Sequence, residues 1–216
     1  KEEQSKFGIL LSGGDTTFSK TMSFTICVVG FSNSIVKRNN TKLNDDIYVT
    51  GNIGDSFIGL KILKNEIKCP SFLKKYFVNA FFMPKIPISI VPHLHKIANS
   101  SIDVSDGLLI DIQKMVKNQK RSFEIYLDKV PVSSKLKKII KLNKFNLEKI
   151  IFNGDDYQTV FTAKKMYRKK INYLSSKLNI KITRIGKIIE NKTDSCVISG
   201  TKRLNYSKYP GYSHFF

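Results

Sequence analysis

The sequence lacks several patterns, and each absence excludes a class of protein. Its three cysteines, Cys27, Cys69 and Cys196, lie far apart and form no CxxC pair, so they predict neither a disulfide framework nor a zinc knuckle. No apolar run reaches the ~18 residues that a membrane-spanning helix needs. We therefore expect a reduced, cytoplasmic location and no membrane partner.

Three common catalytic signatures are also missing. The chain has no GxxxxGK[ST] phosphate-binding loop, no glycine-rich kinase loop and no GxSxG nucleophile elbow. A protein of this sequence that transfers phosphate therefore needs a site built from carboxylates and a metal ion.

Acidic residues are scarce, because 17 Asp and Glu stand against 37 Lys and Arg, and the net charge is +20. Such a charge is typical of nucleic-acid binding. However, arginine, which reads bases and grips phosphates in a fork, is rare here, and the lysines are scattered. We therefore predict that the charge reflects composition and solubility rather than a nucleic-acid partner. A positive surface also helps to collect phosphorylated substrates.

The length of 216 residues predicts one domain plus part of another, at about 150 residues per domain. The 41% hydrophobic content is enough for a core and too high for a disordered chain. Strand-like and helix-like segments alternate from residue 46 onward, which predicts an α/β or α+β fold. The expected helices are 1–7, one that has Asp55 or Ser56 as its N-cap and includes Leu63, 71–82, 88–98, 107–117 and 165–178. The expected strands are 9–11, 24–31, 47–50, 101–104, 122–127, 158–162 and 180–189. Strand 24–31 is apolar and expected to be buried, and 32–44 is expected to be a linker.

Two glycine-containing motifs could bind phosphate and metal. In Gly13-Gly14-Asp15, the glycines allow backbone N–H groups to approach a phosphate and the carboxylate could hold a cation, although an ordinary turn has the same composition. The segment Asp103–Gly107 lies at a strand-to-helix junction, where α/β proteins place ligands. Carboxylates there suit Mg²⁺, and the alternative is a simple helix cap formed by Ser105 or Asp106.

Two further segments are less specific. Asn153–Tyr157 combines a glycine, two adjacent acids and an aromatic residue before a strand, which is either functional or a surface turn. The aromatic tail 210–216 could stack on a planar ligand or dock on the core. The three histidines form no recognisable metal triad.

Taken in order, these segments resemble thiamine-monophosphate kinase, a member of the aminoimidazole ribonucleotide synthetase-like superfamily. The matching stretches are GGDTT (13–17), DDIYVTGNIGDSFIGL (45–60), SSIDVSDGLLIDI (100–112), GDDYQTVFT (154–162), ITRIGKI (182–188) and GYSHF (211–215). The resemblance implies transfer of the γ-phosphate of ATP directly to thiamine phosphate, with Mg²⁺ neutralising charge and no catalytic side chain beyond those that position the reactants.

The resemblance also implies roles for individual residues. Nucleotide contacts fall on Gly14, Asp15, Arg38 and Ser105, metal ligands on Asp15, Asp103 and Asp106, and substrate contacts on Asp155 and Tyr212. Asp155 stands where the family usually has a glutamate, so its reach is one methylene shorter.

Family members carry a further N-terminal segment of roughly a hundred residues, near the size of a small domain, with additional metal ligands and much of a homodimer surface. By this resemblance, residues 1–40 are the end of the nucleotide-binding and dimerisation domain, and 41–216 are the C-terminal domain. We therefore expect the isolated chain to be an inactive fragment of the kinase. The alternatives are another ATP-using member of the superfamily, or an inactive basic fragment that binds nucleic acid or a protein partner.

Overall fold

The computed structural model describes residues 1–191 and 194–204, and its contacts divide the chain into two units, 1–35 and 36–216. The first unit contains one helix, α1 (Glu2–Phe7). Gly8 ends this helix in the left-handed conformation, with φ 61°, and the cap N–H donates to the carbonyl oxygen of Gln4. The predicted helix 1–7 and its glycine stop are therefore confirmed.

The strands predicted at 9–11 and 24–31 are wrong, because residues 9–35 form neither helix nor strand. The apolar side chains of the second segment are exposed, with Phe24 at 86% and Ile26 at 85%. A strand needs hydrogen-bonding neighbours and a covered face, and residues 1–35 supply neither. Apolar β-forming composition is therefore not sufficient for a strand in this unit.

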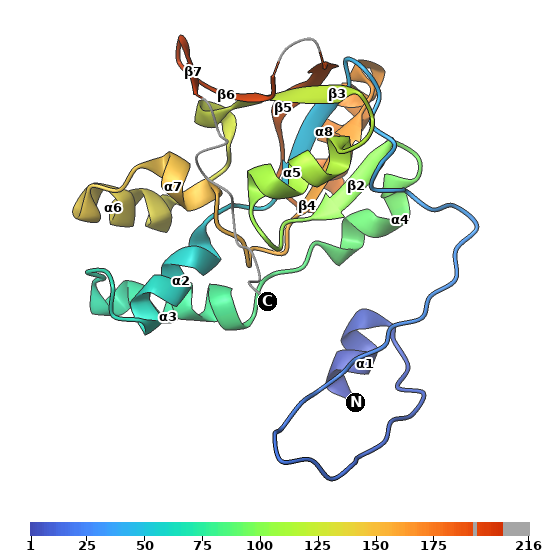
Figure 1. Cartoon of the computed structure of the whole chain (residues 1–216), viewed down its shortest axis with the longest axis vertical. Helices are drawn as coiled ribbons and strands as arrows, with labels where there is room; N and C mark the ends of the chain where they lie inside the picture. The colour runs from blue at the N-terminus through green and yellow to red at the C-terminus, as the bar shows by residue number, and fades with distance from the viewer. Residues whose placement is uncertain (192–193, 205–216) are drawn as a thin grey trace. The chain divides into compact units, whose positions relative to one another are not determined.

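The second unit is built on a seven-stranded sheet in the order β2-β4-β1-β5-β3-β6-β7 (Figure 1). The neighbours pair antiparallel except β3 and β6, which run parallel. The strands are β1 (Asp46–Thr50), β2 (Ser100–Asp103), β3 (Arg121–Tyr126), β4 (Thr159–Ala163), β5 (Ile182–Glu190), β6 (Cys196–Ser199) and β7 (Lys202–Leu204). The mixed α/β class predicted from the sequence is confirmed.

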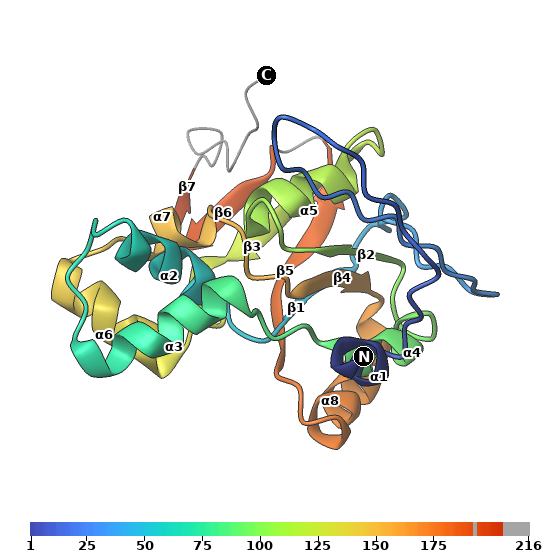
Figure 2. The ribbon, with the colours of Figure 1, turned by 90° about the horizontal axis from the view of Figure 1, so that it is seen from below.

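Helices cover both faces of this sheet, as Figure 2 shows. On one face, α5 (Leu108–Val116) packs on Ile47, Val49 and Val160. On the other, α4 (Val91–Leu94) and α8 (Arg168–Lys177) pack on Tyr48 and Phe161. Alternate residues of β1 and β4 therefore enter opposite cores, as the pleat of a strand requires.

A third apolar cluster joins four helices beside the sheet (Figure 2). These helices are α2 (Asp55–Leu63), α3 (Ser71–Phe82), α6 (Ser134–Asn143) and α7 (Leu147–Ile151). Sequence reasoning missed α6 and α7 because lysines dominate that stretch, yet Leu136 and Ile139 of α6 are fully buried. Ser133 caps α6 by accepting a hydrogen bond from the N–H of Leu136.

Three short 3₁₀ helices, 88–90, 127–129 and 165–167, complete the elements described. The helix predicted over 88–98 is divided between the first of them and α4. Of the helices in the described part of the chain, none is long and apolar enough to cross a bilayer.

Candidate functional site

Two loops that carry predicted site residues meet at one edge of the sheet. Residues 104–107 follow β2 and residues 152–158 precede β4, and these antiparallel strands pair with Asp103 opposite Thr159. The N–H of Asp155 donates to the carbonyl oxygen of Ser105 at 3.0 Å, and the N–H of Tyr157 donates to that of Val104 at 2.9 Å. The tertiary structure thus joins two motifs that are about fifty residues apart in the sequence.

Two glycines allow the loops to approach this closely. A Cβ atom on Gly154 would lie 1.8 Å from the carbonyl oxygen of Ser105, and one on Gly107 would lie 2.2 Å from that of Phe152. Gly107 also has φ +138°, which other residues rarely adopt. No side chain larger than hydrogen fits at either position without separating the loops.

Asp111, in the first turn of α5, holds the first loop from beneath. Its side chain is fully buried, and Oδ2 accepts hydrogen bonds from the N–H groups of Ser105 and Asp106 at 3.0 Å and of Gly107 at 3.2 Å. The residue at the N-cap position of α5 is Gly107, so neither Ser105 nor Asp106 is its N-cap. Sequence reasoning missed Asp111, although a single acid within the apolar run LLIDI was a signal.

Lys114, one turn further along α5, connects Asp111 with Asp106. Its Nζ donates to Oδ1 of Asp111 at 2.7 Å and also to Oδ2 of Asp106. Burial lowers the pKa of Lys114, but the hydrogen bonds and charges of Asp106 and Asp111 outweigh it and raise that pKa above its ordinary value. The ammonium group therefore stays charged between the two carboxylates.

Acidic side chains dominate the space around the joined loops. Burial, and then the charge of Asp106, raises the pKa of Asp155. Burial and then the charges of Asp155, Asp103 and Asp106 raise the pKa of Tyr157. The negative charges of these carboxylates act on one another and on the phenol, and a cation bound among them would reduce that repulsion.

The carboxylate oxygens in this loop pair fit a magnesium ion that is also coordinated by phosphate oxygens. Carboxylate oxygens are the hard ligands that Mg²⁺ prefers, and proteins commonly bind it through one or two carboxylates together with substrate phosphates. Within residues 1–191 and 194–204, no three His, Cys, Asp or Glu side chains are grouped so that they could hold a metal ion alone. The loop pair therefore offers part of a metal site rather than a complete cage.

Asp156 serves a different purpose from its neighbour Asp155. Its carboxylate is buried and accepts hydrogen bonds from the N–H groups of Gly54 at 2.7 Å and Ser56 at 3.4 Å, at the start of α2. Burial raises the pKa of Asp156 to about 7, against these hydrogen bonds. Asp156 thus joins the second loop to α2, whereas the pKa of Asp155 is raised by burial and by the charge of Asp106.

The other predicted residues lie outside this loop pair. Gly14 and Asp15 are exposed in the first unit, where Asp15 accepts a hydrogen bond from the N–H of Thr16 at 2.8 Å. Arg38 is exposed, next to Lys37, whose carbonyl oxygen accepts from the N–H of Ser101 on β2. Tyr212 lies outside the described residues.

The described residues of the second unit line at least two cavities. One of about 760 Å³ lies beside α3 and is lined by Asp55, Tyr76, Asp156 and Lys181 among others. Burial raises the pKa of Asp55, which accepts a 2.6 Å hydrogen bond from the hydroxyl of Tyr76.

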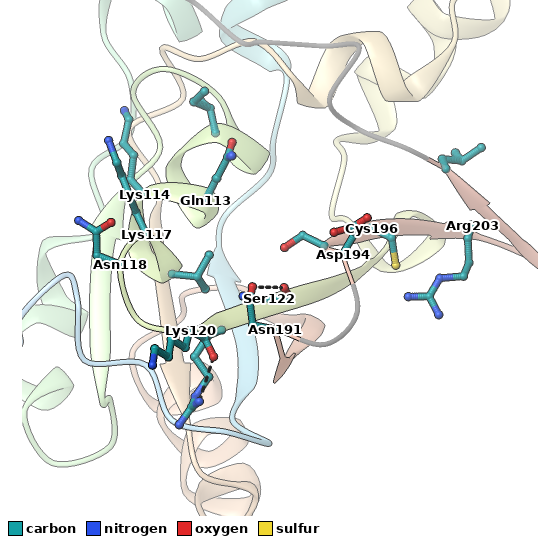
Figure 3. Close-up of a pocket in the computed structure, with 15 residues that line it drawn as sticks. Gln113, Lys114, Lys117, Asn118, Lys120, Ser122, Asn191, Asp194, Cys196 and Arg203 are labelled. Atoms are coloured by element: carbon teal, nitrogen blue, oxygen red, sulfur yellow. Dashed lines mark hydrogen bonds between the residues drawn. The ribbon is translucent and has the colours of Figure 1, made fainter.

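The larger cavity, of about 1350 Å³, lies between α5 and the strands β3 and β6. Figure 3 shows Lys114 and Lys117 together on one side of it, with Asp194, Cys196 and Arg203 on the other. Among the described residues that the resemblance assigned to the site, none lines either cavity, but Lys114 connects the larger one to the loop pair.

Comparison with known proteins identifies the fold. The model of the AIR synthase related protein, C-terminal domain, matches residues 44–199, and the chain therefore belongs to that family.

Within it, the chain is similar to thiamine-monophosphate kinases. It is 34% identical over 217 aligned residues to that of Buchnera aphidicola subsp. Schizaphis graminum, which covers 97% of this chain and 65% of the relative. The chain thus spans just under two thirds of this relative's length.

Solved structures give the same result. AaThiL complexed with AMPPCP and TMP superposes with a TM-score of 0.69 at 29% identity, covering 83% of this chain and 54% of that one. The thiamine-monophosphate kinase of Stenotrophomonas maltophilia K279a also superposes with a TM-score of 0.69, covering 80% of this chain and 55% of that one, and its 24% identity supports the fold alone. The resemblance predicted from the sequence motifs is confirmed.

Proposed function

We propose that this chain forms the C-terminal part of a kinase that transfers the γ-phosphate of ATP to thiamine phosphate, giving thiamine diphosphate and ADP. The observation that carries the proposal is the joined loop pair, which brings Ser105 and Asp106 to Asp155 at the edge of the sheet. The similarity to thiamine-monophosphate kinases over 97% of the chain supports this choice of substrate.

The chain's own residues bind and position the reactants. Asp103 and Asp106 are candidate ligands of Mg²⁺, Ser105 contacts the nucleotide, and Asp155 contacts thiamine phosphate. Mg²⁺ held there would supply positive charge that neutralises the negative charge developing during transfer. Gly14, Asp15 and Arg38 complete the nucleotide contacts in this proposal, Asp15 is also a metal ligand, and Tyr212 packs on the thiamine moiety.

The test is a phosphoryl-transfer assay on the natural gene product that contains this chain, with ATP, Mg²⁺ and thiamine phosphate. We expect thiamine diphosphate as product. Asp106→Asn should lower the rate at least about 100-fold, the cost of losing one electrostatic contact to the transition state. Formation of another product from other phosphorylated substrates, and none from thiamine phosphate, would assign the chain to a different ATP-using member of the superfamily.

Asp45→Asn is the matched control for this variant. Asp45 is likewise a hydrogen-bonded carboxylate, since its two oxygens accept from Asn99 Nδ2 at 2.8 and 3.0 Å, but it is buried, whereas the side chain of Asp106 is 34% exposed. However, Asn99 precedes β2, whereas the loop pair lies at the other end of that strand. We expect Asp45→Asn to lower stability without a comparable loss of rate, so an equal loss in both variants would refute the role of Asp106.

The proposal extends to a cytoplasmic homodimer and to an isolated 216-residue chain without significant kinase activity. Cell fractionation tests the cytoplasmic location, and sedimentation of the gene product tests the homodimer. Robust turnover by the isolated chain that disappears in Asp15→Asn would contradict the third.

A further inference from the structure

We propose that Lys114 is an exchangeable counter-ion: its ammonium group holds Asp106 in the free protein and leaves it when a divalent cation binds there, while Asp111 keeps the loop in place. This inference rests on the proposed function, because it assumes that Asp106 is a metal ligand.

In the free protein the ammonium group of Lys114 is the cation that lies against Asp106, where we propose that a divalent cation binds. The ammonium group donates to carboxylates on two different segments, Asp106 in the loop and Asp111 in α5. A bound divalent cation would compete with it for the oxygens of Asp106, since both are cations and both need carboxylate oxygen. Lys114 therefore lowers the affinity of Asp106 for metal and, until metal binds, compensates the charge of Asp106.

The two carboxylates differ in a way that permits exchange. The side chain of Asp111 is fully buried and anchored by three backbone N–H groups, so this residue stays where it is. The side chains of Lys114 and Asp106 are 32% and 34% exposed. Their ion pair is therefore open to solvent and to an entering cation, and such partly exposed pairs contribute little net stability.

The displaced ammonium group has space to occupy. Lys114 lines the cavity of about 1350 Å³ between α5 and the strands β3 and β6 (Figure 3). A lysine has a flexible four-carbon stem, so Nζ can leave Asp106, retain Asp111 or reach solvent in this cavity, and stay charged.

The experiment measures metal binding rather than activity. Mn²⁺ binding to the natural gene product is followed by the electron paramagnetic resonance of the free ion, and Asp106→Asn identifies the site. We expect Lys114→Met to bind Mn²⁺ about fivefold tighter, a small coupling between two competing cations. Lys114→Arg, which keeps the charge, should bind within twofold of the wild type and covers the case in which Lys114→Met does not fold.

Lys117→Met is the control for general charge. Lys117 lines the same cavity next to Lys114, and among the described residues it forms no ion pair. We expect its removal to change Mn²⁺ affinity less than twofold. Equal tightening in Lys114→Met and Lys117→Met would overturn the proposal, as would weaker binding in Lys114→Met.

A second readout follows the ammonium group directly. In ¹⁵N spectra of lysine side chains, the free protein should show a protected NH₃⁺ signal that is missing in Lys114→Met, and Mg²⁺ should shift this signal because Nζ then leaves Asp106. A signal that persists unchanged when Asp106 binds metal would overturn only the exchange. If Asp106→Asn binds Mn²⁺ as tightly as the wild type, Asp106 is not a metal ligand. This inference would then fail, and so would the part of the proposed function that makes Asp106 a ligand of Mg²⁺.

Discussion

Gly154→Ala tests whether the loops 104–107 and 152–158 pack directly against each other. The added Cβ would lie 1.8 Å from the carbonyl oxygen of Ser105 and 2.8 Å from the carbonyl carbon of Asp106. Both neighbours are backbone atoms, so no side chain can rotate away. The loops must separate, at a cost of about 1–3 kcal/mol for overpacking.

Separation also weakens the two backbone hydrogen bonds from Asp155 and Tyr157. Each is worth about 1 kcal/mol, so we expect a total loss of about 3 kcal/mol in the free energy of unfolding. At about 2–4 °C per kcal/mol for a domain of this size, the melting temperature should fall by about 6–12 °C. Differential scanning calorimetry and urea unfolding measure the loss.

Gly30→Ala is the control, because a Cβ at Gly30 meets no atom within 4 Å and φ there is not positive. We expect its free energy of unfolding to change by less than about 0.5 kcal/mol. If Gly154→Ala melts within about 2 °C of the wild type, the two loops do not make this contact and do not form a shared site.

Three further changes probe charges and bonds around the site and the sheet. Burial raises the pKa of Asp46, but Arg168 and then Arg184 outweigh it and hold that pKa below its ordinary value, so the stabilisation is present above pH 4 and disappears at lower pH. Arg168→Met should cost about 2 kcal/mol at pH 7, less than a fully buried pair because the Arg168 side chain is 44% exposed and Arg184 remains, and acid unfolding curves should show the difference shrinking at low pH. Burial raises the pKa of Asp156 to about 7, so between about pH 4 and 7 the carboxyl ionises in the unfolded chain while it stays protonated in the folded protein. The wild type should therefore lose stability as the pH rises through this range, and Asp156→Asn should remove that slope in urea titrations. Tyr76→Phe removes the hydroxyl that donates to Asp55, and we expect a loss of about 1.5–3 kcal/mol by thermal unfolding; an unchanged melting temperature would contradict that bond.

The local sequence pattern was sufficient to predict many of the helices and strands of the second unit. The predicted helix 71–82 has the bounds of α3, and the predicted strands 122–127 and 158–162 differ from β3 and β4 by one residue at each end. These segments have a strong hydrophobic periodicity and end at clear stop signals, and their packing in the fold favours the same secondary structure as their local sequence. Local signals failed at α6, where lysines on the exposed face concealed two buried apolar positions.

The strand predicted at 24–31 shows the opposite failure. Its apolar, β-branched composition favours a strand, but a strand exists only through partners that lie elsewhere in the chain. Residues 1–35 contain no such partner, and the segment is exposed. Composition therefore indicates a capacity for a strand, and the environment decides whether it forms.

The sequence by itself determined the family, because six ordered motifs sufficed for the resemblance that comparison then confirmed. It also indicated Asp106 and Asp155 as candidate site residues, because a motif of adjacent acids and glycines can be recognised in the sequence alone. Only the tertiary structure decided which acid does what. Asp156 is turned to α2, Asp111 is buried beneath the loop, and Lys114 compensates Asp106. These roles depend on which backbone N–H groups and charges each carboxylate meets after folding, and spacing along the chain does not encode that.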